Sequence, residues 1–248
     1  LLATLSLSET KAWTDPLLLL RRDVRHAWHI TTVWARYGWK RMDTGRPDRA
    51  APLFARACLA PWFDIRVCEG YIRAVGELGR REEARRVLRQ TLSLFPKDMQ
   101  LLGLAIRISE EEGDREALER LAGRVEALPV LSPKLLCWLA ARRGEQGRLP
   151  EALTLLRRHL PLYAGIPAVW IQLGNTLLKQ RRPEESEAAY LRALALDPTL
   201  DGVQNLVGLL RAERGDWTGA ETAFREASRQ NPGNRDAQEN LDKVRARR

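Results

Sequence analysis

The 248-residue chain is poor in the residues that mark disulfide-rich, metal-binding and membrane-spanning proteins. It contains three cysteines, three histidines and two methionines. No two cysteines form a CxxC pair, which argues against a zinc site, and Cys58, Cys68 and Cys137 are interpreted as buried packing residues. The longest apolar runs, such as 17–20, fall far short of the roughly 20 residues needed to cross a bilayer. We therefore predict no membrane span within the chain.

Motifs of the common enzyme classes are missing as well. The sequence has no GxGxxG after a strand, no GxxxxGK[ST], no HExxH and no GxSxG. His26 and His29 have a spacing that can chelate a metal on a helix, but no carboxylate or cysteine completes a site. His159 is interpreted as a locally hydrogen-bonded packing residue. The sequence therefore predicts a chain that is not an enzyme, with no catalytic residue, no metal and no cofactor.

Positive charge is in excess, with 41 Lys+Arg against 32 Asp+Glu and a formal net charge of +9. Such an excess can attract nucleic acid. Here, however, many arginines stand three or four residues from glutamates, as in residues 80–86, and aromatic residues do not interleave with the basic runs. We therefore expect ion-paired, solvated helix faces and disfavour a nucleic-acid partner.

A 34-residue period organises most of the chain. One position of the period holds glycine five times and arginine once: Gly45, Gly79, Gly113, Gly147, Arg181 and Gly215. In each period, apolar residues recur three and four apart in two runs, which predicts a pair of antiparallel helices. We predict a lead-in with a degenerate half-repeat helix at 1–30, six repeats over 31–234 and a capping helix at 235–248. The repeats span 31–64, 65–98, 99–132, 133–166, 167–200 and 201–234.

Residue size at fixed positions of the period predicts how the two helices of a repeat meet. Gly174 is small at the eighth position, and Tyr190 is large at the twenty-fourth, so the ring is expected to fill the space beside the glycine. Proline near the end of a period stops the second helix, as at Pro96, Pro198 and Pro232.

This pattern resembles the tetratricopeptide repeat (TPR) family. The residues that carry the resemblance best are Trp170, Leu173, Gly174, Tyr190, Ala193 and Pro198. The resemblance covers residues 31–234 and implies an all-α fold, a right-handed superhelical solenoid of antiparallel helix pairs with about six repeats plus terminal helices. It also implies a non-catalytic protein–protein interaction scaffold that binds an extended peptide or helix in its concave groove.

The family register assigns the groove lining to the first helix of each repeat. The candidate partner-binding residues are Arg66, Arg73, Arg107, Lys134, Ile171, Asn175, Lys179, Asn205 and Leu209. In the middle repeats the arginines are expected to pair with glutamates of the same lining, whereas the later repeats offer donors for a peptide backbone or carboxylate. A solvated face without a dedicated ligand explains the same residues. No three successive repeats carry the family's clamp for a C-terminal carboxylate, which disfavours recognition of a chaperone tail.

A weaker resemblance concerns the N-terminal segment. Residues 11–15, with Leu19, Leu20 and Val24 following, are similar to the segment that joins the last membrane helix to the C-terminal repeat domain of polytopic membrane glycosyltransferases and O-antigen-ligase-like proteins. It implies an alternative function as the extracytoplasmic accessory repeat domain of a membrane-bound glycan-transfer enzyme, whose catalytic part would precede Leu1. A half-repeat cap on a soluble scaffold explains the same residues. The partner, the oligomeric state and the compartment, either cytoplasmic or extracytoplasmic, stay open.

Overall fold

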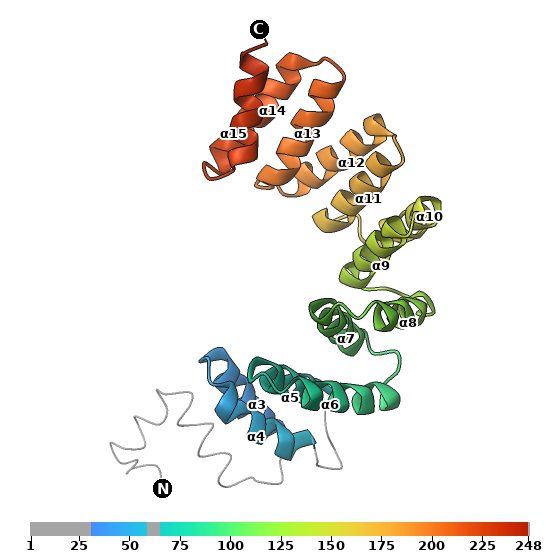
Figure 1. Cartoon of the computed structure of the whole chain (residues 1–248), viewed down its shortest axis with the longest axis vertical. Coiled ribbons are helices and arrows are strands. Elements are labelled where there is room, and N and C mark those ends of the chain that lie inside the picture. Colours follow the sequence, from blue (N-terminus) through green and yellow to red (C-terminus); the bar gives the residue numbers. More distant parts are fainter. Residues whose placement is uncertain (1–30, 59–64, 248) are drawn as a thin grey trace, which may run out of the picture. The chain divides into compact units, whose positions relative to one another are not determined.

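A computed structural model describes residues 31–58 and 65–247, and every regular element in those ranges is a helix. The α-helices, labelled in Figure 1, are α3 (Thr31–Asp43), α4 (Pro47–Cys58), α5 (Ile65–Glu77), α6 (Arg81–Leu94), α7 (Met99–Glu112), α8 (Arg115–Glu126), α9 (Pro133–Glu145), α10 (Leu149–His159), α11 (Pro167–Lys179), α12 (Pro183–Leu196), α13 (Asp201–Glu213), α14 (Trp217–Gln230) and α15 (Arg235–Arg245). A short 3-10 helix, Leu160–Leu162, follows α10. The predicted all-α class is confirmed. The predicted lead-in at 1–30, which contains His26 and His29, lies outside the described residues.

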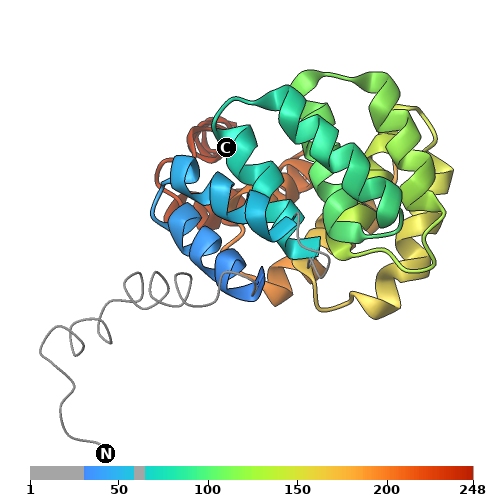
Figure 2. The same ribbon diagram turned by 90° about the horizontal axis from the view of Figure 1, so that it is seen from below.

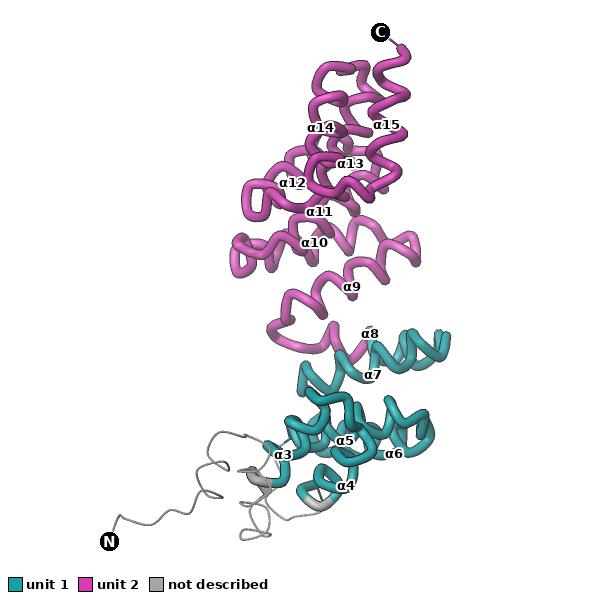
Figure 3. The backbone as a smooth tube through the Cα atoms, turned by 90° about the vertical axis from the view of Figure 1, so that its left-hand side faces the viewer, with its two compact units in different colours: residues 1–121 teal, residues 122–248 magenta. Residues whose placement is uncertain are grey.

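The chain divides into two compact units, which Figure 3 draws in different colours. Unit 1 ends at Leu121 and unit 2 begins at Ala122, so the division falls within α8. Inside each unit, successive helices are joined by short turns and pack as antiparallel pairs, for example α5 with α6 and α13 with α14 (Figures 1 and 2). No helix among the described residues is long and apolar enough to cross a membrane.

The turns inside the pairs use left-handed backbone. φ is positive at five glycines and one arginine: Gly45, Gly79, Gly113, Gly147, Gly215 and Arg181. The Arg181 amide donates to the Leu178 carbonyl at 2.9 Å, just as the Gly147 amide donates to Gly144 at 3.2 Å. Because the hydrogen-bond pattern is the same, the geometry of the turn is imposed by the helix pair, and Arg181 adopts a φ of 58° that ordinarily favours glycine.

The replacement Arg181→Gly is expected to raise the free energy of unfolding by about 0.5–1 kcal/mol, because it removes a Cβ from left-handed backbone. Arg181 is exposed and makes no side-chain hydrogen bond or ion pair with the described residues, so no contact is lost. The matched control is Gly147→Ala, whose Cβ would meet no atom within 4 Å but would be strained at a φ of 76°. It should lower the stability by about 1 kcal/mol in urea denaturation followed by circular dichroism. If both variants changed the free energy of unfolding in the same direction, left-handed backbone strain at Arg181 could not be the cause.

A glycine facing an aromatic ring forms the seam between the two helices of a pair. A Cβ built on Gly174 would lie 2.5 Å from the ring of Tyr190, and one on Gly208 would lie 2.5 Å from the ring of Phe224. Tyr190 and Phe224 are 0% and 1% exposed. The packing expected for Gly174 and Tyr190 is thus confirmed. In unit 1 the buried ring of Phe54 has the same role.

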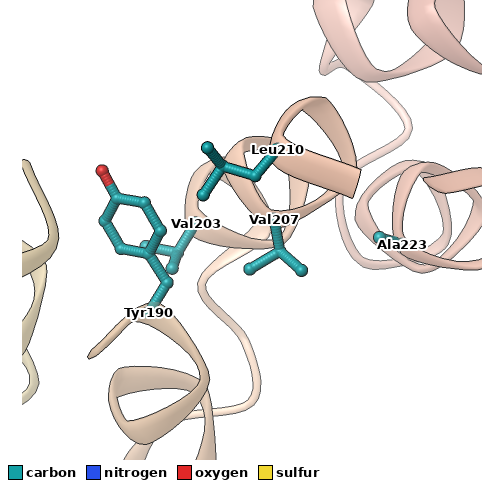
Figure 4. Packing of buried hydrophobic residues seen from close by; sticks show 5 residues of the cluster. All are labelled: Tyr190, Val203, Val207, Leu210 and Ala223. Atoms are coloured by element: carbon teal, nitrogen blue, oxygen red, sulfur yellow. The ribbon is translucent and has the colours of Figure 1, made fainter. Parts of the chain in front are cut away.

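Tyr190 also joins one pair to the next. Its side chain belongs to a buried cluster with Val203, Val207 and Leu210 of α13 and Ala223 of α14 (Figure 4). The hydrophobic core is therefore a series of seams between neighbouring helices, as in other tandem-repeat proteins.

Candidate protein-interaction surface

In unit 1, the first helices α5 and α7 border a polar cavity of about 360 Å³. Its charged wall includes Arg73 and Glu77 from α5 and Arg107 and Glu111 from α7, with Arg81 of α6 and Glu112 of α7 beside them. The structure thus brings together two of the residues that the repeat register predicts for the groove. Arg66 is also exposed on α5, but it does not line this cavity.

The charges of this cavity are compensated only in part. Arg73 forms an ion pair with Glu69 at 2.6 Å, and its guanidinium carbon lies 6.0 Å from the centroid of the Trp39 ring. Arg107, Glu77 and Glu111 make no side-chain hydrogen bond or ion pair with the described residues. The expected pairing of arginines with glutamates is therefore confirmed for Arg73 and wrong for Arg107. Among the described residues, an exposed guanidinium without a partner thus lines the same cavity as two exposed carboxylates.

In unit 2, the predicted cations Lys134 of α9 and Lys179 of α11 are both exposed. Neither makes an ion pair with the described residues. Lys179 Nζ lies 3.9 Å from where a Cβ on Gly144 would stand, so the ammonium group is at the C-terminal turn of α9. The negative end of the helix dipole favours a cation there. Ile171, by contrast, is partly buried against the cluster around Tyr190.

The two predicted asparagines are each held by one hydrogen bond. Tyr190 Oη donates to Asn175 Oδ1 at 2.6 Å, and Asn240 Nδ2 of α15 donates to Asn205 Oδ1 at 3.1 Å. Burial raises the pKa of Tyr190, so its hydroxyl stays protonated at neutral pH and keeps donating. Asn175 is half-buried and its amide NH₂ has no acceptor among the described residues, whereas Asn205 is 9% exposed and joins α13 to α15.

Leu209, the last predicted residue, lies at a cavity of about 500 Å³ between α13, α14 and α15. It is 38% exposed, and the wall also includes Trp217 and Val244. The guanidinium carbon of Arg247 lies 5.2 Å from the centroid of the Trp217 ring. Sequence reasoning missed the contribution of the last helix because it treated 235–248 as a cap. The signal was present, since the apolar spacing of that segment continues the pattern of a first helix.

Other arginines form ion pairs between neighbouring helices of unit 2. Glu187 of α12 accepts hydrogen bonds from Arg211 of α13, at 2.7 Å, and from Arg214, which follows α13 directly. One 34-residue period later, Glu221 of α14 forms the equivalent ion pair with Arg245 of α15 at 3.5 Å. The two glutamate side chains are each 10% exposed. Such pairs compensate positive charge at the seams between helices. The expected ion pairs on helix faces occur in residues 80–86, where Arg85 lies 3.3 Å from Glu82.

The groups that could bind a metal are scattered in the described part of the chain. No set of three histidine, cysteine, aspartate or glutamate side chains within it could hold a metal ion. His159 is 7% exposed and its Nδ1 lies 3.0 Å from the Leu155 carbonyl oxygen, which confirms its interpretation as a packing residue. The three cysteines are free thiols; Cys68 is buried, and Cys58 and Cys137 are half-buried.

Three solved structures have closely similar folds. The C-terminal part of a TPR repeat-containing protein from Cytophaga hutchinsonii has a TM-score of 0.67 at 11% identity, over 94% of this chain and 96% of that one. PilF of Pseudomonas aeruginosa has a TM-score of 0.66 at 15% identity, over 84% and 95%. A chain of the APC/C hetero-tetramer Cut9-Hcn1 has a TM-score of 0.68 at 16% identity; the match covers 92% of this chain and 45% of that one. These similarities define the class of the fold as an all-α tandem repeat of helix pairs.

The family comparison identifies the repeat itself. Residues 167–200, which form α11 and α12, match the family described as Tetratricopeptide repeat. That segment contains all six residues that carried the resemblance. The predicted resemblance to the tetratricopeptide repeat family is confirmed by this match, which covers one repeat of the chain. No curated protein matches it. The resemblance to membrane glycosyltransferases and O-antigen-ligase-like proteins finds no support in these comparisons, and the residues that carried it lie outside the described ranges.

Proposed function

We propose that the chain is a non-catalytic scaffold that binds an extended peptide or a helix of a partner protein along the first helices of its repeats. Tandem helix-pair folds generally serve protein–protein interaction. The observation that carries the finer proposal is that Arg107, Glu77 and Glu111 line one cavity of unit 1 and have no ion-pair partner in the described part of the chain. Arginines on the seams, in contrast, have partners.

The wall of that cavity suggests the chemistry of the bound segment. A guanidinium without a partner can take a carboxylate in a bidentate pair, and the two glutamates can take a lysine or arginine. Ile72, Leu104 and Ile108 supply apolar surface in the same cavity. A segment with charges of both signs flanking an apolar side chain would complement these groups.

Unit 2 offers a second binding segment on α11. The amide donors of Asn175 and the ammonium group of Lys179 lie one helical turn apart and suit a peptide carbonyl and a carboxylate. Ile171 adds apolar surface on the same helix. The remaining members of the proposed binding set are Arg66, Arg73, Lys134, Asn205 and Leu209.

The proposal is tested with peptides selected by the immobilised wild-type protein from a random display library. Arg107→Glu, for peptides that bind unit 1, or Lys179→Glu, for peptides that bind unit 2, should weaken binding at least 10-fold in fluorescence anisotropy, about 1.4 kcal/mol. The matched control is Arg192→Glu on α12, since Arg192 is exposed and makes no ion pair with the described residues. It should leave affinity within about twofold.

Circular dichroism of each variant checks that the helices remain folded. Peptides whose affinity is unchanged by both first-helix substitutions, or reduced equally by the control on α12, would show that binding does not use the first-helix face.

A further inference from the structure

The cavity of about 500 Å³ in unit 2 lies between α13, α14 and α15, three helices that pack against one another (Figure 1). Its wall is backed by the protein core, because Ala212 and Trp217 of the wall pack against a buried cluster. Phe224 and Val244 belong both to that cluster and to the wall. Trp217 is only half-buried, so part of this apolar surface faces solvent. An apolar side chain that entered the cavity would leave water and extend the core.

Two cations line the same cavity. Arg247 is exposed and makes no ion pair with the described residues, and its contact with the Trp217 ring, at 5.2 Å, keeps the charge beside the apolar wall. Lys243 pairs with Glu239 at 3.8 Å, but both side chains are exposed, so this pair contributes little. Of the described residues that line the cavity, only Glu213 is acidic, and it has no ion-pair partner among them. Positive charge is therefore in excess around an apolar surface.

The spacing along the chain relates this cavity to the charged cavity of unit 1. Trp217 and Arg81 line the two cavities at positions 136 residues apart, which is four periods of 34 residues. Arg247 and Glu111 have the same separation. The cavity is therefore a feature of the repeat, and the residues at its positions set what it can bind. In unit 1 they provide charges of both signs, whereas in unit 2 they provide an aromatic wall with excess positive charge.

We propose that the cavity between α13, α14 and α15 binds an acidic segment of a partner protein, in which one bulky apolar side chain enters the cavity and neighbouring carboxylates pair with Lys243 and Arg247. The Arg247 guanidinium can stay on the Trp217 ring and take a carboxylate in a bidentate pair. The sign of the charges selects acidic over basic segments. This inference rests on the proposed function for the class of partner and adds the chemistry of the segment bound at this site.

The experiment measures the fluorescence anisotropy of labelled peptides mixed with the whole chain. The probe is a short peptide with one phenylalanine between two pairs of aspartates. In one reference peptide glycine replaces the phenylalanine, and in the other lysines replace the aspartates. The wild type should bind the probe at least about 10-fold more tightly than either reference. Trp217→Ala should weaken binding of the probe by a similar factor, because the aromatic wall is lost.

Charge variants keep the test valid if Trp217→Ala fails to fold. Lys243→Glu combined with Arg247→Glu should reverse the preference, so that the lysine peptide binds more tightly than the probe. Glu213→Gln should raise the affinity for the probe about threefold, since it removes a like charge. The matched control is Arg235→Glu on α15, since Arg235 is exposed, lies outside the cavity and makes no ion pair with the described residues. At physiological salt it should change the affinity less than about twofold.

Three results would overturn the inference: no binding of the probe at millimolar concentration, equal affinity for the three peptides, or an unchanged preference in the double variant. A second copy of the chain in the cavity would also overturn it, and would appear in sedimentation velocity as a dimer that Trp217→Ala dissociates. Arg107 and Lys179, which test the proposed function, do not line this cavity. Failure of the proposed function and failure of this inference are therefore distinguishable.

Discussion

Tyr190→Ala is expected to lower the local free energy of unfolding of unit 2 by about 3–5 kcal/mol, since it removes a fully buried aromatic side chain. The ring fills the space above Gly174 and packs against Val203, Val207 and Leu210 of the next pair. A cavity at this place would weaken both the seam inside one pair and the seam between two pairs. The measurement is hydrogen exchange of the α11, α12 and α13 amides, read by mass spectrometry.

The control for this prediction is Tyr190→Phe, which keeps the ring and removes only the hydroxyl. It should cost about 1 kcal/mol, because Asn175 Oδ1 loses its donor but lies in a half-buried place that water can reach. Combining Tyr190→Phe with Asn175→Ala should be less than additive, since the two changes remove the same hydrogen bond. A loss in Tyr190→Phe as large as that in Tyr190→Ala would show that the hydroxyl, and not packing, dominates.

Gly208→Ala has the second large expected effect. A methyl group at this residue would lie 2.5–2.9 Å from three ring atoms of Phe224, whose ring is 1% exposed. We expect a loss of about 1–3 kcal/mol from overpacking, in spite of the better helix propensity of alanine. Chemical denaturation and hydrogen exchange of α13 and α14 would measure it.

A matched control stands on the same helix. Gly202→Ala in α13 introduces the same methyl group at a place where no atom lies within 4 Å. It should stabilise the protein by up to about 1 kcal/mol through helix propensity. The double variant Gly208→Ala with Phe224→Leu should recover part of the loss, because the smaller side chain makes room. Equal effects of the two glycine substitutions would mean that α13 and α14 are not in contact at Gly208.

Much of the candidate surface follows from helical periodicity, and part of it does not. The repeat register places Arg73 and Arg107 on first helices, and the structure shows them in one cavity. It does not reveal that Arg107 is unpaired, because this depends on where the neighbouring carboxylates point. Nor does it reveal that Asn205 is covered by Asn240 of α15, a contact between residues far apart in the chain.

The positions of two cysteines show the same limit of what sequence spacing can predict. Cys58 and Cys68 follow no motif, and each by itself is explained by packing. They line one cavity because the end of α4 packs against α5, and this depends on how the two helices pack. A sequence pattern records spacing along the chain and cannot show which two side chains meet across a seam.

The sequence by itself determined the all-α class, the helix pair, the turn at the position shared by Gly147 and Arg181, and the packing of Tyr190 against Gly174. These features follow from local physics: apolar periodicity, backbone freedom and side-chain size act within one repeat. Only the tertiary structure decided which charges pair, which asparagine amide has no acceptor among the described residues and which cysteines line one cavity. Those outcomes depend on contacts between helices, where distance and burial, and not spacing along the chain, set the interaction energy.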